Sequence, residues 1–474
     1  MPNKHHNQNQ IPNALNPSQV EVVMVPFPAQ GHLNQLLHLS RLISAYNLPI
    51  HFIGNATHNK QAKLRVHGWS LNSISNIIFH DFIIPPLPTP PPPNPNADTK
   101  FPSHIQPVLS VPIHYRQPLL ALVQKLSSKS KRVVVIYDSI AASAIQDVGS
   151  LSNVECHAFQ SISAFSVLMY YWDKLGKPFE EEGKKVMPRN IPSFQGCFPK
   201  EFKEYLLAQI SINAKFNKGS LLNTTNVLEK PFIDLLDKIF KRKNWAVGPF
   251  NPVELKKKDH QISNARHFCL EWLDKQEPNS VIFVSFGTTT TFTDEEIKEM
   301  ALGLEQSEQK FIWVARDADK ADVSNGEVRK IELPKGYEER VKSRGLVVRD
   351  WAPQLEILAH SSTGGFLSHC GWNSCMESIT MGVPIAAWPM HSDQPTNAVL
   401  ITELLKVGTF VREWERRNEM TTAAAVENGV KRLMASEEGH EIRKRAEEMG
   451  AAVRQTMDDV GNLELDSFIA HITR

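Results

Sequence analysis

Short apolar runs alternate along the chain with segments in which apolar residues recur every three or four positions. Residues 22–27 form the first such run, and the apolar residues of 33–43 then lie on one face of a helix that we expect to end near Tyr46. Another apolar run begins at residue 50. Runs of this length predict buried strands, and the intervening period predicts amphipathic helices. The pattern therefore favours parallel sheets flanked by helices.

The same alternation begins a second time beyond the middle of the chain. Residues 245–249 close the first series, and the charged residues 256–259 predict an exposed linker. Residues 280–286 then form a new apolar run, and Thr293 with Glu296 has the spacing of a capping box. The prediction is an α/β protein with two Rossmann-like domains. Its expected parts are a disordered tail (1–20), a first domain (21–250), a linker (251–265), a second domain (266–455) and a final helix that packs back on the first domain (456–474).

The composition restricts the class of protein further. A length of 474 residues suits two or more domains, and a formal net charge of +1 gives no electrostatic case for a nucleic acid or an anionic membrane. Five cysteines without a CxxC pair favour a reducing compartment. The N-terminal residues lack the apolar core of a signal peptide, and no apolar run approaches the ~20 residues of a spanning helix. We expect a monomeric cytoplasmic protein that enters no membrane and binds no nucleic acid.

Residues 351–394 carry the most specific chemistry. Trp351 follows the apolar residues 346–348, so its ring would stand at the carboxyl end of a strand, where it can stack on a planar base. A second short strand, 364–368, leads through a glycine turn into a helix at 374–381. That helix start offers unpaired N–H groups and a positive dipole end. The segment is therefore suited to a nucleoside diphosphate.

Polar side chains around this turn can supply the remaining contacts. The candidates are His369, Asn373, Ser374, Glu377, Asp393 and Gln394. The first three can donate to phosphate, and Glu377 lies roughly one turn into the helix, where its carboxylate can accept hydrogen bonds from ribose hydroxyls. The last two follow the next apolar run and can bind sugar hydroxyls. The alternative is that Trp351, Trp372 and Trp388 are core aromatics and that the polar residues are helix caps.

A histidine and an aspartate in the first half are candidates for catalysis. His32 comes directly after the first predicted strand, at the start of its helix, and Asp138 ends another strand, 133–137. Ligands of open parallel sheets bind beyond the carboxyl ends of the strands. A helix start disfavours protonated imidazole, so we expect His32 to be a neutral base whose tautomer Asp138 can fix. Alternatively, both residues cap helices, or His32 is a buried polar residue.

The stretch from Trp351 to Gln394 resembles the signature box of the plant family 1 UDP-sugar glycosyltransferases, from its opening Trp-Ala-Pro-Gln to its closing Asp-Gln. The resemblance extends to the N-terminal turn at His32 and to residues 281–291 and 303–313. It implies the GT-B arrangement, in which two Rossmann-like domains face each other across a cleft. The first domain would bind the acceptor and the second the UDP-sugar. The implied reaction is an inverting displacement that uses no metal and no other cofactor.

The family pattern also implies a role for individual residues. A histidine in the first turn is the general base there and a later aspartate supports it, and His32 and Asp138 match those positions. In the box, Trp351 would stack on uracil. Ala352 and Gln354 would bind uracil through their backbone, and Glu377 would bind ribose. The residues implied for phosphate are Thr288, His369, Asn373 and Ser374. Asp393 and Gln394 would bind the sugar, and Trp372 would lie within the same site.

A second set of matches concerns the acceptor. Residues 26–40, 245–252 and 285–290 resemble the zeatin O-glycosyltransferases, a cytokinin-modifying branch of the family. The expected reaction transfers glucose, or xylose, from UDP-glucose or UDP-xylose to the side-chain hydroxyl of zeatin, with Asn34 and Gln35 as acceptor contacts. Branch membership fixes an acceptor only loosely. A flavonoid or other phenolic acceptor is the alternative, and a sugar-nucleotide-binding protein without turnover is another.

Two sequence features stand outside this scheme. Residues 317–319 match the Asp-x-Asp pattern of metal-dependent glycosyltransferases, but they follow a predicted strand in a charged loop, and we expect no metal site there. The proline-rich residues 85–95 fit neither a helix nor a central strand. They form either an acceptor-side loop or a flexible linker.

Overall fold

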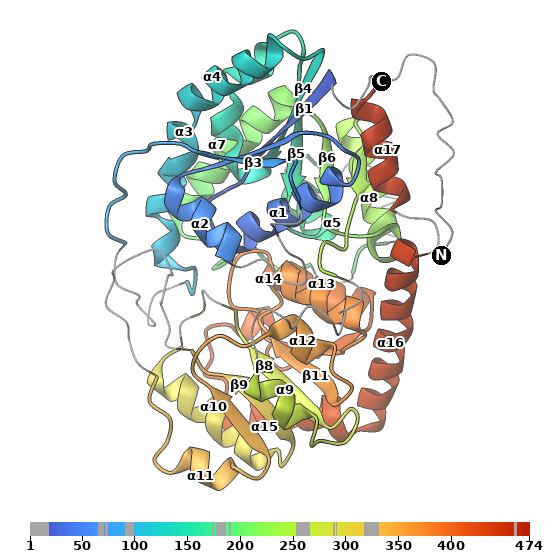
Figure 1. Cartoon of the computed structure of the whole chain (residues 1–474). Helices are drawn as coiled ribbons and strands as arrows, with labels where there is room; N and C mark the ends of the chain where they lie inside the picture. The colour runs from blue at the N-terminus through green and yellow to red at the C-terminus, as the bar shows by residue number, and fades with distance from the viewer. Residues whose placement is uncertain are drawn as a thin grey trace.

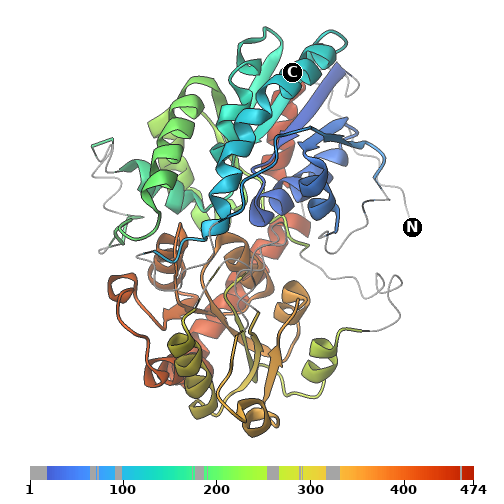
Figure 2. The same ribbon diagram turned by 90° about the vertical axis from the view of Figure 1, so that its left-hand side faces the viewer.

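The computed structural model contains two α/β halves, each built around a parallel sheet (Figure 1). It describes residues 19–64, 71, 74–90, 99–172, 175–176, 186–188, 191–252, 266–287, 290, 292–316, 331–458 and 462–474. The first half, blue to green, occupies the upper part of Figure 1, and the second half, yellow to orange, lies below it. The perpendicular view in Figure 2 shows the same two halves, with the red C-terminal helices passing from the second to the first.

The first sheet has the strand order β3-β2-β1-β4-β5-β6-β7, and all paired neighbours among the described strands run parallel. These strands are β1 (Val20–Val25), β2 (Ile50–Gly54), β3 (Ile77–Asp81), β4 (Arg132–Asp138), β5 (Val154–Gln160), β6 (Asn217–Leu222) and β7 (Asn244–Ala246). The helices of this half are α1 (Gln30–Ser44), α2 (Ala56–Leu64), α3 (Val111–His114), α4 (Arg116–Ser127), α5 (Ala164–Trp172), α7 (Lys200–Phe216) and α8 (Asn226–Phe240). Central strands covered on both faces explain the continuous apolar runs of the sequence.

The second sheet has the order β10-β9-β8-β11-β12-β13 and is also parallel. Its strands are β8 (Val281–Ser285), β9 (Lys310–Val314), β10 (Gly345–Val348), β11 (Thr363–Ser368), β12 (Ile385–Ala387) and β13 (Gly408–Phe410). Its helices are α9 (Phe268–Leu273), α10 (Asp294–Gln306), α11 (Tyr337–Val341), α12 (Gln354–Leu358), α13 (Trp372–Met381), α14 (Gln394–Val399), α15 (Ala423–Ala435) and α16 (Glu437–Asp458). The predicted α/β class is confirmed, and so is the capping box of Thr293 and Glu296 at α10.

Both sheets reverse their strand order at one point. In the first sheet the reversal lies between β1 and β4, and in the second it lies between β8 and β11. A crevice opens at such a point because the helices that follow the two strands leave on opposite faces of the sheet. His32 follows β1 and Asp138 ends β4, while His369 follows β11. The topology therefore places all three residues at switch points.

The last helix, α17 (Leu463–Ile472), packs against the first half rather than the second. The ring of Phe468 is fully buried, and its centroid lies 5.2 Å from those of Trp245 and His157. Arg132 of β4 donates from Nη1 to the carbonyl oxygens of His471 and Ile472 at the carboxyl end of the helix. Since α16 packs on α13 of the second half, α16 and α17 together bridge the two halves.

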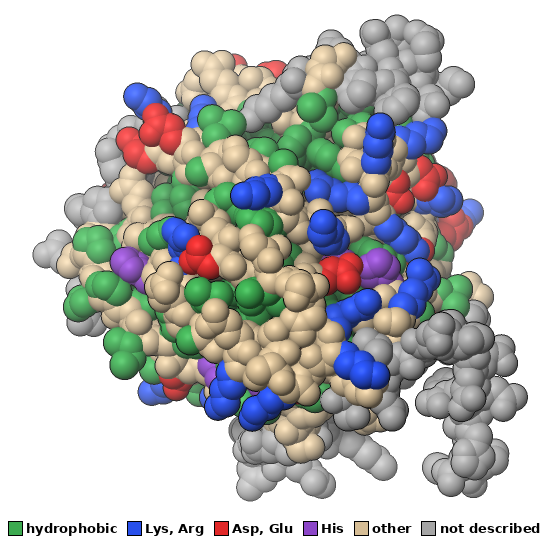
Figure 3. Space-filling model, turned by 90° about the horizontal axis from the view of Figure 1, so that it is seen from above, with side chains coloured by type: hydrophobic (Ala, Val, Ile, Leu, Met, Phe, Trp, Pro, Cys, Tyr) green, Lys and Arg blue, Asp and Glu red, His purple; other side chains and the backbone are tan. Residues whose placement is uncertain are grey.

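Several sequence predictions fall outside the described residues. These are Thr288, the Asp-x-Asp residues 317–319, the charged stretch 256–259 and the end of the proline-rich loop, 91–95. Among the helices of the described residues, none is both long enough and apolar enough to cross a membrane. Seen from the first-half end, acidic and basic side chains are interspersed among neutral and apolar ones, in keeping with the net charge of +1 (Figure 3).

Truncating Phe468 tests the anchoring of α17. Phe468→Ala should lower the free energy of unfolding by about 3–5 kcal/mol, because it removes a fully buried ring from the seam between helix and sheet. Leu463→Ala in the same helix is the control, since Leu463 is 62% exposed and its loss should cost less than about 0.5 kcal/mol. Urea unfolding followed by tryptophan fluorescence measures both. Equal losses would show that α17 is not anchored through Phe468.

Candidate functional site

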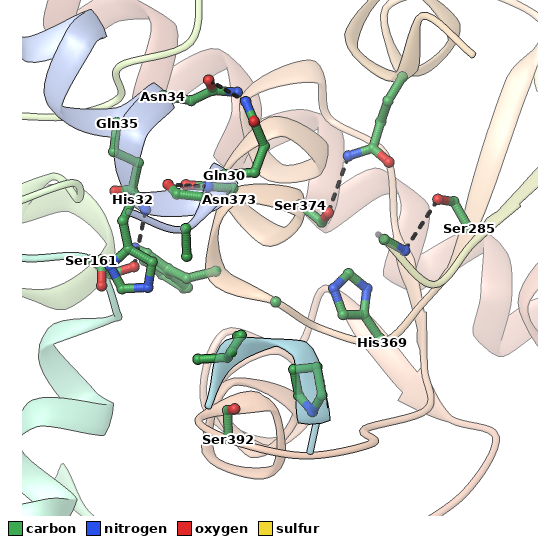
Figure 4. Close-up of a pocket in the computed structure, with 18 of the residues that line it drawn as sticks. Gln30, His32, Asn34, Gln35, Ser161, Ser285, His369, Asn373, Ser374 and Ser392 are labelled. Atoms are coloured by element: carbon green, nitrogen blue, oxygen red, sulfur yellow. Dashed lines mark hydrogen bonds between the residues drawn. The ribbon is translucent and has the colours of Figure 1, made fainter. Parts of the chain in front are cut away.

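A cavity of about 710 Å³ lies between the carboxyl ends of the two sheets. His32 from α1 and His369 from the turn after β11 stand on opposite sides of it (Figure 4). Thirteen of the site residues predicted from the sequence line this cavity, and they are His32, Asn34, Gln35, Trp351, Ala352, Gln354, His369, Trp372, Asn373, Ser374, Glu377, Asp393 and Gln394. Asp138 is fully buried and contacts His32. Residues far apart in the sequence are thus brought to one cavity.

His32 is held by a buried carboxylate. Its Nδ1 lies 2.7 Å from Oδ2 of Asp138, and its ring packs edge-on against Phe27 with 5.3 Å between the centroids. The other carboxylate oxygen of Asp138 accepts a hydrogen bond from the backbone N–H of Ile140 at 3.1 Å. Asp138 is therefore both a cap and a partner of His32. The cap alternative fails for His32, because Ala29 is the N-cap of α1 and the Nδ1 atom of His32 is engaged by Asp138.

The pKa of His32 differs from the expectation based on the helix start. Burial lowers this pKa, whereas the charge of Asp138 and its hydrogen bond raise it, and the charge of Asp393 adds a smaller increase. The resulting pKa of His32 lies above the usual value for histidine. A carboxylate in direct contact outweighs the partial charge of a helix end. The expectation that the helix start decides this pKa is wrong. Because Nδ1 is engaged by Asp138, Nε2 is the nitrogen available to a ligand.

The turn after β11 is shaped around His369. Burial lowers the pKa of His369 to about 4, so its ring is neutral at physiological pH. Gly287 and Gly371 lie against it, and a Cβ atom at either glycine would approach Nε2 of His369 to 2.9 Å and 2.6 Å. Nδ1 of His369 has no hydrogen-bond partner in the part of the chain that the structure describes. Packing against two glycines therefore fixes this ring next to the start of α13.

The nucleoside end of the cavity has one exposed ring and one buried carboxyl. Trp351 is 48% exposed, which leaves a ring face open to a planar base. Gln354 donates from Nε2 to Oε2 of Glu377 at 2.7 Å and to Oγ of Ser374 at 3.0 Å. Burial raises the pKa of Glu377 to about 7. Gln354 thus ties together the residues expected to bind ribose and phosphate.

The carboxamide of Gln394 and the carboxyl group of Asp393 stand at the end of the cavity where the sugar is expected. Gln394 is buried, and its Oε1 accepts from the backbone N–H groups of Met390 and His391 at 2.9 and 3.0 Å. Its amide nitrogen lies 3.4 Å from both ring nitrogens of His391, and the residue lines the cavity. Oδ2 of Asp393 accepts from Asn397 at 2.7 Å, and burial raises the pKa of Asp393 to about 6.

Other predicted residues make contacts that the sequence did not indicate. Trp372 is buried and donates from Nε1 to the carbonyl oxygen of Asn223, across the two halves. Asn373 donates to the carbonyl oxygen of Gly31, also across the halves. In the first half, Asn34 accepts from Gln30 at 2.6 Å and Gln35 donates to Ser161 at 3.1 Å. Trp372 and Asn373 therefore join the halves as well as lining the cavity.

Sequence reasoning missed two kinds of residue. Gly287 was not singled out, although its positive φ of 72° and its approach to His369 make a larger residue unfavourable. Asn397 was missed altogether, and its one sequence signal is its place four residues after Asp393, one turn along α14. Among the described residues, the cluster that is able to share a metal ion is Glu155, His157 and His471, and none of these lines the cavity.

Comparison with known families agrees with this arrangement. Residues 18–252 match the family described as "Glycosyltransferase, N-terminal domain", and residues 258–442 match "UDP-glucoronosyl and UDP-glucosyl transferase". A solved structure of Phytolacca americana UGT2 complexed with UDP-2fluoro-glucose and pterostilbene superposes with a TM-score of 0.74 at 25% identity, over 96% of this chain and 100% of that one.

Two characterised plant enzymes are similar over nearly the whole length. Zeatin O-glucosyltransferase of Phaseolus lunatus is 54% identical, over 99% of both chains. Zeatin O-xylosyltransferase of Phaseolus vulgaris is 53% identical, over 96% of this chain and 99% of that one. The resemblance to the zeatin O-glycosyltransferases is confirmed. The chain belongs to the plant family 1 UDP-sugar glycosyltransferases and is a UDP-glycosyltransferase of the GT-B fold.

Proposed function

We propose that this enzyme transfers glucose or xylose from the UDP-sugar to the side-chain hydroxyl of zeatin, with inversion at the anomeric carbon. The observation that carries the proposal is the His32–Asp138 pair, which faces the glycine turn and Asp393 across one cavity. The similarity to a zeatin O-glucosyltransferase and a zeatin O-xylosyltransferase supports the acceptor. Their nearly equal identities give no preference between the two sugars.

The proposed mechanism is a single displacement. Nε2 of His32 takes the proton of the acceptor hydroxyl, and the oxygen attacks C1 of the sugar while the C1–O bond to UDP breaks on the opposite face. Asp138 stabilises the imidazolium that forms. The start of α13 and neutral His369 can donate hydrogen bonds to the departing diphosphate, whose charge grows as the bond breaks. This scheme uses no metal ion or other cofactor, and we place the enzyme, as a monomer, in the cytoplasm.

The acceptor side of the cavity favours a neutral ligand. The described residues that line it from the first half include no Asp, Glu, Lys or Arg. Carboxamides are present instead, at Gln30, Asn34 and Gln35. A carboxamide can donate to a ring nitrogen and accept from an N–H group, which suits the purine of zeatin. A flavonoid or other phenolic acceptor is the second candidate, because hydroxyl groups can use the same amides.

A competition assay tests the acceptor. Zeatin and a flavonol, offered together with UDP-glucose and then with UDP-xylose, should give glycosylated zeatin in excess, measured by chromatography with UDP release as a second readout. Preferential glycosylation of the flavonol would support the phenolic alternative. Tight UDP binding without turnover of any acceptor would instead indicate a non-catalytic binding protein.

His32→Ala tests the base. Turnover should fall roughly a hundredfold to ten-thousandfold, because no other group would take the acceptor proton, while the Kd for UDP should stay within about twofold. Steady-state kinetics and calorimetry measure the two effects. His440→Ala is the matched control, since His440 is exposed on α16 and should be silent. Near-normal turnover of His32→Ala would remove His32 from this role.

The pH profile tests Asp138. Since the neutral imidazole is the base, kcat/KM should fall as the pH falls through the raised pKa of His32. Asp138→Asn removes the charge that raises this pKa, so the acid limb should move to lower pH and the plateau should fall at least about tenfold. Asparagine can still cap Ile140, so the fold should persist. Asp147→Asn, which disrupts a surface ion pair with Arg116, is the control. An unmoved acid limb in Asp138→Asn would contradict the proposed pairing.

A further inference from the structure

A buried polar contact joins the two halves beside the sugar end of the cavity. The first turn of α5 meets α14, and Oγ of Ser163 lies 2.8 Å from Oδ1 of Asn397. Oγ of Ser166 lies 2.6 Å from Oγ1 of Thr396 and 3.0 Å from Oδ1 of Asn397. All four residues are at most 1% exposed. Such groups must be paired with one another, because water cannot reach them.

Asn397 connects this interface to two parts of the donor site. Its Nδ2 donates to Oδ2 of Asp393 at 2.7 Å and to the carbonyl oxygen of Cys370 at 2.9 Å. Cys370 has a positive φ of 63°, an unfavourable backbone conformation for a residue with a side chain. It lies between His369 and Gly371 in the turn expected to bind phosphate. One amide therefore holds both the carboxylate and the strained residue of the turn.

The chemistry of the partners fixes the orientation of the Asn397 amide. A carboxylate and a carbonyl only accept, so the nitrogen of Asn397 must face them and its oxygen must face the serines. Thr396 donates its hydroxyl proton to the carbonyl oxygen of Asp393 at 2.7 Å, so Ser166 donates to Thr396. Oγ of Ser163 lies 2.8 Å from both Oγ of Ser166 and Oδ1 of Asn397, and its proton goes to Asn397 if the buried Oδ1 is to have a donor. Two chains of hydrogen bonds thus start on α5. One ends on the side chain of Asp393 and the other on its backbone.

The end of α5 that carries these serines is fixed within the first half. The backbone N–H groups of Ala164 and Phe165 donate to the buried carboxylate of Glu229 at 3.1 and 2.8 Å. The N–H of Ser166 donates to Oγ of Ser163 at 3.0 Å. With its own N–H groups satisfied in this way, the helix start presents the two hydroxyls to the second half.

We propose that Asn397 is a positioning residue that couples docking of the two halves to recognition of the donor sugar. This inference rests on the proposed function, in which Asp393 binds the sugar. When α5 is docked, the two hydrogen-bond chains hold Asp393 in the orientation that the sugar requires. When the serine hydroxyls are missing, Asn397 and Thr396 lose their anchors, and Asp393 loses its fixed position. Binding of UDP alone should change little, because Asp393 is assigned to the sugar and the backbone N–H of Cys370 is also held by Oγ of Ser368 at 3.1 Å.

The test compares binding of UDP with binding of UDP-glucose, both by calorimetry without acceptor. The double variant Ser163→Ala/Ser166→Ala should raise the Kd for UDP-glucose about tenfold while the Kd for UDP changes less than about twofold. Asn397→Ala should raise the Kd for UDP-glucose at least as much. The matched control is Ser40→Ala, which removes an equally buried hydroxyl from α1, where Ser40 donates to the carbonyl oxygen of Leu36. A structural defect alone would weaken both ligands together.

Asp393→Ala separates this inference from the function on which it rests. If Asp393→Ala weakens UDP-glucose selectively but the serine and Asn397 variants do not, the coupling is overturned and the donor role of Asp393 stands. If Asp393→Ala leaves the two Kd values in their original ratio, the assigned sugar contact itself is wrong. Parallel loss of UDP and UDP-glucose binding in the serine variant would also overturn the coupling. None of these measurements depends on the identity of the acceptor.

Discussion

The chemistry of this site depends on one buried contact, the 2.7 Å approach of Asp138 to Nδ1 of His32. The contact exists because β1 and β4 are neighbours at the point where the first sheet reverses its order, so the residues at their carboxyl ends meet. Burial alone would lower the pKa of His32, and the carboxylate reverses that effect. The same carboxylate caps the turn after β4, which fixes it without help from the second half.

Transfer also requires that the base and the donor keep a fixed relation across the cavity, although they belong to different sheets. Hydrogen bonds across the boundary provide this relation, among them those from Trp372 to Asn223, from Asn373 to Gly31 and from Ser163 to Asn397. Trp372 and Asn373 belong to the first turn of α13, and Asn397 holds Asp393. The segments that would bind the donor thus also help to dock the halves. The contacts that dock the two halves therefore also fix residues expected to bind the donor.

Much of this arrangement could be predicted from the sequence, because local patterns encode it. The apolar runs gave the strands, and His32 and Asp138 followed from their places after strands of one parallel sheet. The sequence offered capping and pairing with His32 as alternatives for Asp138. That one carboxylate does both, and that it raises the pKa of His32, depends on a distance between residues 106 positions apart. For Asn397 the sequence offers only its place one turn after Asp393. Its importance arises from serines on another domain, and no local pattern records such a pairing.

The two sides of the cavity differ in the segments that supply their walls. On the donor side, Gln354 donates a hydrogen bond to Glu377, and Gln394 accepts one from the backbone N–H of Met390. The side chains of Gln354 and Gln394 are therefore oriented before any ligand binds. Preorganisation of this kind suits a donor that is shared across a family. On the acceptor side, α1 contributes the linked amides of Gln30 and Asn34, while loop residues supply much of the remaining wall. Loops change readily between relatives, so the signature box identifies the donor class but leaves acceptor choice to other segments.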